Sequence, residues 1–307
     1  MFKEMLSVII PTKDRCDDLH RLLGDISSQA VLPLQVIVAD GGDASCETLL
    51  NDFPQLNIDY LRCKPASLTA QRNAGLKKVR SEATLVAFLD DDVSLEKESF
   101  SNMIRFWENA SGDIGGAGFN LTNIPFERRT ILDRLFLVNP EKPGAILRSG
   151  FQNKSRVLNE TVNVKWLVGC ATVWRKHIFD EFTFDEWFSG YAHCEDVDFS
   201  YRVGRKYKMF IVADARAEHI SRHLYRSEDI ATNFSLGKMH VTNRLYLVRK
   251  NPGFSLLLAY WSCFGLFLNN LIRGVFKGDE RCMLRAKGNM AGFLSSFSIK
   301  SRKEYLK

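Results

Sequence analysis

The chain has 307 residues, of which 45% are hydrophobic and 25% charged, and this composition excludes a disordered protein. The length allows a large core in one or two domains. The formal net charge of +6 is unevenly divided, because residues 201–307 hold 20 lysine and arginine against 7 aspartate and glutamate residues, or +13, which leaves −7 for residues 1–200. The acidic part suits a cation site. The basic part suits a membrane surface or nucleic acid, unless it is an ordinary solvated surface.

The seven cysteines are scattered, odd in number and without a C-x-x-C pair. This pattern predicts reduced thiols in a cytosolic compartment rather than a disulfide framework or a zinc site. The apolar stretch at residues 6–10 is too short for the core of a signal peptide and ends at Pro11.

In the first half of the chain, short apolar runs alternate with segments of helical spacing. The runs that predict strands are residues 6–10, 35–39, 58–62 and 84–89. The segments that predict helices are residues 15–28, 46–53, 67–79 and 94–107. This alternation is typical of βαβ units and indicates a parallel sheet.

Three adjacent aspartates, Asp90, Asp91 and Asp92, directly follow the apolar run Leu85–Leu89. Their mutual repulsion favours a bound cation, and oxygen ligands alone favour Mg²⁺ or Mn²⁺. In an open α/β sheet, ligands bind at the carboxyl ends of the strands. The alternative is a solvated acidic turn that caps the next helix.

The second half is less regular. Its expected elements are a strand at 115–121, a long variable loop with short helices at 122–163, a strand pair or buried strand at 164–175, a helix at 195–205 and a strand at 208–212.

The C-terminal region differs in composition, since residues 251–272 carry no charged side chain. Arg249 and Lys250 precede this stretch, and Arg273 and Lys277 follow it. A spanning helix needs roughly 20 apolar residues, and serine and asparagine interrupt this run. The pattern favours a helix lying on or partly within an anionic membrane face, with a core or dimer helix as the alternative.

Six segments, taken in order, resemble glycosyltransferase family 2 over about residues 5–225. They are Val8-Ile-Ile-Pro-Thr12, Asp40, Thr69-Ala-Gln-Arg-Asn-Ala-Gly75, Phe88-Leu-Asp-Asp-Asp-Val93, His193-Cys-Glu-Asp-Val-Asp-Phe-Ser-Tyr-Arg202 and Ala217-Glu-His219. The resemblance implies an α/β fold of GT-A type, with a mostly parallel Rossmann-like sheet flanked by helices. It also implies a catalytic domain at 1–225, and we expect residues 226–307 to form a helical C-terminal region associated with the membrane.

The resemblance further implies an inverting transfer of a sugar from a nucleotide-diphosphate donor, with Mn²⁺ or Mg²⁺ on the diphosphate. The implied metal ligands are Asp92, Asp90 and His219, with His223 as a weaker competitor. The implied nucleotide-sugar contacts are Pro11, Thr12, Asp40, Arg72, Asn73, Asp90, Asp91 and Gly169. Asp40 could instead be a turn residue before Gly41, and Arg72 a surface helix residue.

Asp196 matches the family's catalytic base, and Glu195 would help to position the acceptor. Alternatively, the pair begins a helix, where acidic side chains favour the positive end of the dipole. An ion pair between Asp198 and Arg202 would be structural. Trp166 and Trp187 would stack on a sugar or pack in the core, and His193 could contact the acceptor.

Two rival functions are a metal-dependent nucleotidyltransferase and a catalytically inactive homologue that binds sugar nucleotides. The sequence has no Walker loop and no G-x-G-x-x-G after the first strand, and no recognisable nucleic-acid motif accompanies the basic charge. We therefore expect no nucleic-acid partner. We expect a peripheral membrane contact through residues 251–290 at the cytoplasmic face, and this location suggests a glycan or lipid-linked acceptor. The nucleotide, the sugar, the linkage and the oligomeric state are left open.

Overall fold

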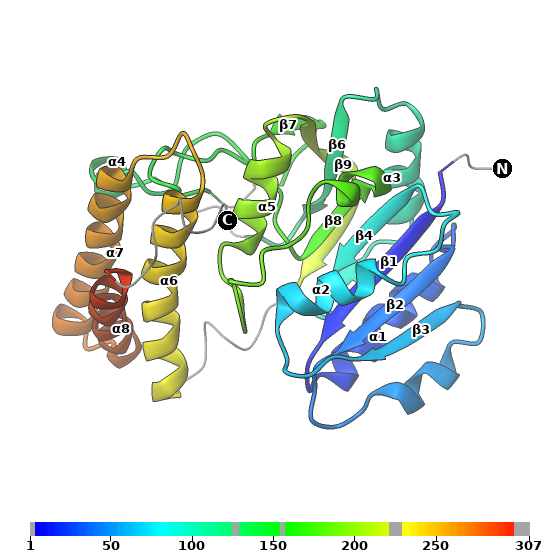
Figure 1. The fold of residues 1–307 in the computed structure, drawn as a ribbon, viewed down its shortest axis with the longest axis horizontal. Coiled ribbons are helices and arrows are strands. Elements are labelled where there is room, and N and C mark those ends of the chain that lie inside the picture. Colours follow the sequence, from blue (N-terminus) through cyan, green and yellow to red (C-terminus); the bar gives the residue numbers. More distant parts are fainter. Residues whose placement is uncertain (1–3, 125–128, 154–156, 221–228, 298–307) are drawn as a thin grey trace. The chain divides into compact units, whose positions relative to one another are not determined.

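The computed structural model describes residues 4–124, 129–153, 157–220 and 229–297, and the chain divides into two compact units (Figure 1). The first unit consists of Met1–Phe126 and Ser155–Ile220, and the second of Glu127–Lys154 and Ser221–Lys307. The segment expected to be a variable loop therefore contributes most of its length to the unit that contains the C-terminal helices. The domain boundary at residue 225 stays a prediction.

The first unit contains one nine-stranded sheet in the order β3-β2-β1-β4-β8-β6-β9-β5, with β7 pairing with β9. Its strands are β1 Leu6–Thr12, β2 Gln35–Asp40, β3 Ile58–Arg62, β4 Leu85–Leu89, β5 Val93–Leu95, β6 Ile114–Leu121, β7 Val162–Val164, β8 Ala171–Arg175 and β9 Lys208–His219. The four predicted strands of the first half are confirmed. Their pairings are parallel, as expected. The expected α/β fold with a central sheet flanked by helices is confirmed, and beyond β4 the sheet is mixed, because β8 is antiparallel to both β4 and β6 while β6 and β9 are parallel.

Helices cover both faces of this sheet. They are α1 Cys16–Ser27, α2 Leu68–Leu76, α3 Ser99–Glu108 and α5 Glu195–Val203, with 3₁₀ turns at Glu47–Asp52 and Lys176–Asp180. The side chains of β1 alternate between two cores: Val8 and Ile10 pack in one with α1 and α3, and Ile9 packs in the other with α5. Every residue of β1, β2 and β4 is buried, as expected for strands covered on both faces.

Two predicted boundaries in this unit were wrong, and both concern the site described below. The helix expected from residue 94 begins at Ser99, because Val93–Leu95 pairs with β9 instead. The strand expected at 208–212 continues to His219, held first by β6 and then by β5. Neither pairing could be read from the local pattern, since both join segments more than 90 residues apart in the chain.

Cys16 and Cys46 form a disulfide, which corrects the expectation that all cysteines are reduced thiols. Cys16 begins α1, and Cys46 lies in the loop after β2, with 5.4 Å between their Cα atoms. The residues are 30 positions apart, so their proximity is a product of the fold. Cys63, Cys170, Cys194, Cys263 and Cys282 are free.

The second unit is helical. It contains α4 Ile131–Leu135, α6 Ile230–Lys250, α7 Leu256–Phe276 and α8 Glu280–Ser296. Gly237 and Gly288 allow α6 and α8 to approach closely, since a Cβ atom on either glycine would lie 2.2 Å or less from the backbone of the other helix. Among the described residues, α7 is the one helix long and apolar enough to cross a membrane, with 28% of its apolar window buried.

Candidate active site

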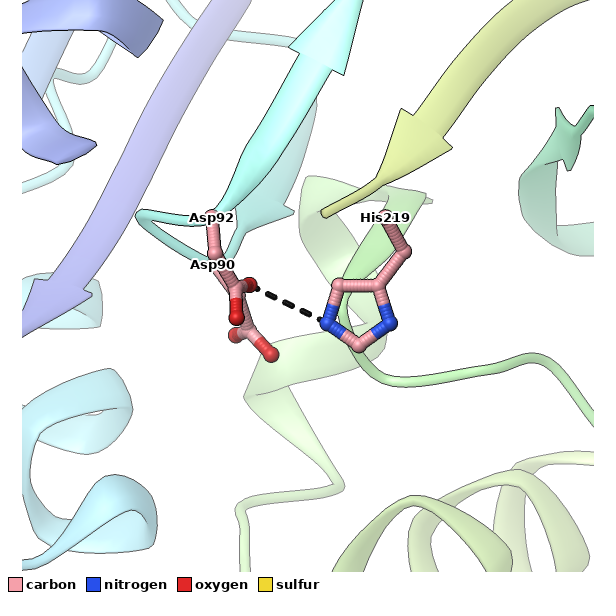
Figure 2. A group of neighbouring side chains, drawn as sticks. All are labelled: Asp90, Asp92 and His219. Atoms are coloured by element: carbon pink, nitrogen blue, oxygen red, sulfur yellow. Dashed lines mark ion pairs between the residues drawn. The ribbon is translucent and has the colours of Figure 1, made fainter. Parts of the chain in front are cut away.

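Asp90, Asp92 and His219 come together at the end of β4 (Figure 2). One potential ligand atom from each side chain lies within 4.8 Å of the others. His219 Nε2 is 3.1 Å from Asp92 Oδ1, and this oxygen is buried and accepts no hydrogen bond from any other described residue. A buried carboxylate oxygen with spare capacity beside an imidazole and a second carboxylate fits a divalent cation such as Mn²⁺.

Strand pairing places His219 in this cluster. Val93 is the direct partner of His219 in the antiparallel β5–β9 pair, and the Ile220 amide donates to the Asp92 carbonyl at 2.8 Å. A histidine 127 residues after Asp92 thus becomes its neighbour. The sequence prediction of three metal-binding residues is matched by their geometry, while metal binding itself stays a prediction.

The three aspartates differ in electrostatic environment. Burial disfavours the charged form of Asp92, but His219 and Arg15 outweigh it, and the pKa of Asp92 lies below its usual value. Burial raises the pKa of Asp91 to about 6, although Arg15 and a 2.8 Å hydrogen bond from Thr12 oppose the rise. Burial also raises the pKa of Asp90 against the charge of Arg72. Asp92 is therefore the carboxylate best suited to hold a cation, and Asp91 serves to fix β1 against β4.

Arg72 connects the aspartate cluster to the predicted catalytic pair. Its guanidinium is only 1% exposed and donates to Asp90 Oδ1 at 3.0 Å, to Glu195 Oε1 at 2.8 Å and to the Gly169 carbonyl at 2.9 Å. Phe184 packs against the guanidinium face at 5.2 Å. The alternative of an exposed surface arginine is excluded. The carboxylates of Asp90 and Glu195 and the Gly169 carbonyl all accept from the one buried guanidinium, which sets the spacing between these three groups.

Glu195 and Asp196 begin α5, as predicted, but they occupy different environments. Glu195 is buried, and its pKa is raised to about 8 by burial and by repulsion from Asp196, against the attraction of Arg72. Asp196 is half-buried, and its Oδ2 atom accepts from the Gly169 amide at 3.2 Å. The more accessible Asp196 is therefore better placed to receive a proton from a substrate.

The backbone around this pair is constrained from two sides. Ala192 and Cys194 have left-handed φ angles of 57° and 77°, which non-glycine residues seldom adopt outside functional or tightly packed sites. Gly169 lies opposite, where an added Cβ would be 2.8 Å from Glu195 Oε1 and 3.0 Å from the Asp196 Cβ. Gly169 therefore packs closely against protein side chains, and its predicted contact with a nucleotide sugar stays a prediction.

Asp40 lies at the end of β2 and is fully buried. Its carboxylate accepts from the Gly42 amide at 2.6 Å, from Arg62 at 2.7 Å and from the Tyr60 hydroxyl. Burial would raise the pKa of Asp40, but these donors lower it below its usual value. The Cys46 amide donates to this carboxylate as well, at 3.3 Å, so a nucleoside would have to compete with four existing donors, and the predicted contact stays a prediction.

The other predicted residues have varied surroundings. Asn73 holds the backbone of Phe184 through two hydrogen bonds of 2.9 and 3.1 Å, and so fixes the segment before α5. Pro11 is buried in β1 beside Thr12, opposite Ala39 of β2.

The remaining candidates are aromatic or charged side chains near α5. Trp166 is 4% exposed and belongs to the core, whereas Trp187 and His193 are half-buried. Asp198 pairs with Arg202 at 2.8 Å, as expected for a structural ion pair. His223 lies outside the described residues.

Sequence reasoning missed two residues that organise the site. Arg15 pairs with Asp91 at 3.0 Å and with Asp92 at 3.3 Å. Gln71 donates to the carbonyls of Thr12 and Ala39, joining the ends of β1 and β2. The available signal was their position, since Arg15 follows β1 and Gln71 stands beside Arg72 at the start of a helix.

The order of the strands and the position of the candidate site at their carboxyl ends agree with the GT-A fold of the solved glycosyltransferases named below. The family model described as "Glycosyl transferase family 2" matches residues 7–183, and the chain belongs to that family. It is therefore an enzyme of the transferase class.

Three known proteins illustrate the similarity. The Minor teichoic acid biosynthesis protein GgaA of Bacillus subtilis (strain 168) is 23% identical over 194 residues, which cover 58% of this chain and 40% of that protein. The mannosyltransferase PcManGT from Pyrobaculum calidifontis, solved with GDP-Man and Mn²⁺, has a TM-score of 0.58 at 12% identity, covering 97% of this chain and 88% of its own. TarS of S. aureus has a TM-score of 0.54 at 12% identity, and the match covers 92% of this chain and 55% of TarS. The chain thus spans about two fifths of the curated relative and about half of TarS.

Proposed function

We propose that the chain is an inverting, metal-dependent glycosyltransferase that moves a sugar from a nucleotide-diphosphate donor to a hydroxyl of a lipid-linked or cell-envelope glycan. The observation that carries this proposal is the grouping of Asp90, Asp92 and His219 within 4.8 Å, one buried arginine away from Glu195. The three candidate cation ligands and the two candidate catalytic carboxylates, Glu195 and Asp196, thus lie close together near the carboxyl ends of the strands, which supports the proposal.

Asp92, Asp90 and His219 would hold Mn²⁺ or Mg²⁺, which would offset the negative charge of the leaving diphosphate. The imidazole favours Mn²⁺ over Mg²⁺, since Mg²⁺ prefers oxygen ligands. The relative PcManGT was solved with GDP-Man and Mn²⁺, and TarS with UDP-GlcNAc, which supports a nucleotide-sugar donor for this fold.

Asp196 would act as the general base. Its carboxylate would take the proton of the acceptor hydroxyl while that oxygen attacks the anomeric carbon from the side opposite the diphosphate. Glu195, which Arg72 holds at 2.8 Å, would position the acceptor and Asp196. Gly169 leaves room for both carboxylates and orients Asp196 through its amide.

The acceptor class rests on two observations. The curated relative takes part in minor teichoic acid biosynthesis, which concerns a cell-envelope polymer. The second unit carries an apolar helix flanked by basic residues, which suits a peripheral contact through residues 251–290 at the cytoplasmic face of the membrane. An inactive homologue is the main alternative, and the presence of both carboxylate sets argues against it.

Thermal unfolding with nucleotides tests the donor site. We expect one of UDP, GDP, dTDP and CDP, with Mn²⁺ or Mg²⁺, to raise the melting temperature, and EDTA to abolish the rise. A ligand at 100 times its dissociation constant stabilises a protein by about 2.7 kcal/mol, which is readily measured. Asp92→Asn should lose this response, while Asp113→Asn, an exposed aspartate paired with Lys208, should keep it. A folded protein that responds to none of the four nucleotides would contradict the proposed function.

A further inference from the structure

Helix α7 exposes a continuous apolar stripe along one face. Leu257 is 79% exposed, Trp261 and Phe264 are each 42% exposed, Ile272 is 46% and Val275 is 58% exposed. Their spacing of three, four or eight residues puts these side chains on the same side of the helix. From the first to the last, the stripe is roughly 27 Å long at 1.5 Å per residue. A soluble surface seldom leaves so long an apolar strip open to water.

Helix α4 and the residue after it, Phe136, extend this stripe. The indole of Trp261 donates to the Leu135 carbonyl at 2.7 Å, and its ring lies 5.1 Å from that of Phe136. Phe136 occupies the space that a side chain at position 265 would take, since a Cβ on Gly265 would be 2.2 Å from its ring. Helix α4 ends at Leu135, and its apolar side chains are 51–84% exposed. They are Ile131, Leu132 and Leu135. We call α4 and the stripe of α7 together the apolar face.

The opposite side of α7 packs on α8 through polar and close backbone contacts. Asn270 donates to Asn289 at 3.0 Å, and Gly274 lies against the backbone of Met283, 3.0 Å from a Cβ built on the glycine. Near the start of α7, the Tyr260 hydroxyl lies 3.1 Å from Ser296 Oγ. These contacts run the length of the helix and fasten it to its neighbour.

This packing argues against a membrane-spanning α7. Its neighbour α8 carries Arg281, Arg285 and Lys287, and α6, which packs on α8, carries Lys238 and further basic residues. If α7 crossed a bilayer with its partners attached, these charges would enter the hydrocarbon at a cost of several kcal/mol. Crossing without them would break the contacts just described. A helix docked in the plane of the interface keeps both the bundle and the water-exposed charges.

Charge indicates which surface the apolar face meets. The second unit contains 21 lysine and arginine against 8 aspartate and glutamate residues, so its formal charge is +13, whereas the first unit carries −7. Arg134 on α4 and Arg273 near the end of α7 have side chains that are 64% and 49% exposed. Basic residues beside exposed apolar side chains match an anionic lipid surface, and repulsion between two copies of a +13 unit disfavours self-association.

We infer that the apolar face of α4 and α7 docks the enzyme on the surface of an anionic bilayer, with α7 lying in the interface and not crossing it. The inference builds on the membrane contact in the proposed function and adds the surface, its orientation and the contribution of α4. It assigns a docking role to α4, which lies within the segment 122–163 that the sequence presented as a variable loop with short helices.

Vesicle flotation of the full chain tests the inference. We expect binding to phosphatidylcholine vesicles that contain phosphatidylglycerol, weak binding to phosphatidylcholine alone, and release of the protein by alkaline carbonate. Leu257→Glu/Val275→Glu should lower the partition coefficient at least tenfold. Leu32→Glu, at a 43% exposed leucine of the first unit, is the matched control and should bind as wild type.

A second variant and two further readouts make the result decisive. Lys277→Glu should weaken binding about fivefold or more, because the attraction between one basic residue and an anionic surface changes the binding constant by about that factor. Resistance to carbonate would show a spanning helix and overturn the inference. Wild-type flotation of the double variant, or a dimer in light scattering that the double variant abolishes, would overturn it as well. The nucleotide-dependent melting shift, measured on the same variants, reports separately on the proposed function and should not change.

Discussion

At the residue scale, neighbouring carboxylates of this site are distinguished by burial and by their partners. Glu195 and Asp196 are adjacent in the chain, yet Glu195 faces Arg72 in the interior and Asp196 is half-buried. Asp91 and Asp92 are both buried and both pair with Arg15, but Thr12 donates to Asp91 whereas His219 contacts Asp92. An acidic run in the sequence shows neither difference, because both depend on side chains from distant segments.

Asp196→Asn tests the assignment of the general base. An amide cannot accept the proton of the acceptor hydroxyl, so we expect sugar transfer to fall by about 10²–10⁴-fold. The nucleotide-dependent melting shift should stay, because Asp196 is not part of the cation cluster. Asp198→Asn in the same helix is the matched variant for loss of stability. It removes the buried negative charge that pairs with Arg202 and should lower the melting temperature. Normal turnover of Asp196→Asn would reassign the base.

Glu195 predicts a pH dependence of stability. Its pKa is about 8 in the folded protein, against 4.5 for the usual side chain. The folded state therefore keeps a proton that the unfolded state releases, and stability is lost as the pH rises from the lower value through the higher one. Glu195→Gln cannot ionise. The free energy of unfolding of this variant, relative to that of wild type, should therefore increase as the pH rises from about 5 to about 8. Urea unfolding in EDTA measures this, and a difference independent of pH would contradict the environment assigned to Glu195.

At the element scale, the site depends on how three segments meet: the end of β4, the start of α5 and the turn before β8. Gly169 belongs to that turn, and Arg72 reaches it from α2. The β5–β9 pair adds His219 from a further segment. Local pattern predicted most of these elements correctly but not the pairing of β5, since a three-residue strand carries too little periodicity to be recognised.

Gly169→Ala tests the contact between the turn and α5. Its Cβ would be 2.8 Å from Glu195 Oε1 and 3.0 Å from the Asp196 Cβ, so an alanine here would displace these two side chains. We expect sugar transfer to fall at least tenfold, because a displacement of about 1 Å at reacting groups is costly. Gly24→Ala in α1 is the control, since nothing lies within 4 Å of its added Cβ. Equal activity of the two variants would show that the contact does not matter to the reaction.

At the scale of the whole molecule, the chain combines an acidic unit that carries the site with a basic helical unit. The Cys16–Cys46 disulfide closes a loop of 30 residues within the acidic unit, and such a link acts mainly by restricting the unfolded chain.

The disulfide therefore predicts a change in global stability. Cys46→Ser should lower the free energy of unfolding by about 2–4 kcal/mol, and dithiothreitol should do the same to wild type. Cys63→Ser removes a free thiol and should have little effect. Chemical denaturation with and without the reductant measures the change. If wild type is insensitive to dithiothreitol, the two thiols are not joined in the purified protein, and the sequence-based expectation of reduced cysteines stands.

The sequence by itself determined the family, the α/β alternation of the first half and the strand that delivers the aspartates, because these depend on hydrophobic periodicity and on short motifs. It also placed Asp90, Asp92 and His219 in one group through resemblance. Only the tertiary structure decided that Arg72 is buried between Asp90 and Glu195, that Asp40 is surrounded by its own donors, and that α4 belongs with α7. These features arise from contacts between segments far apart in the chain, and no local pattern encodes which distant surfaces fit together.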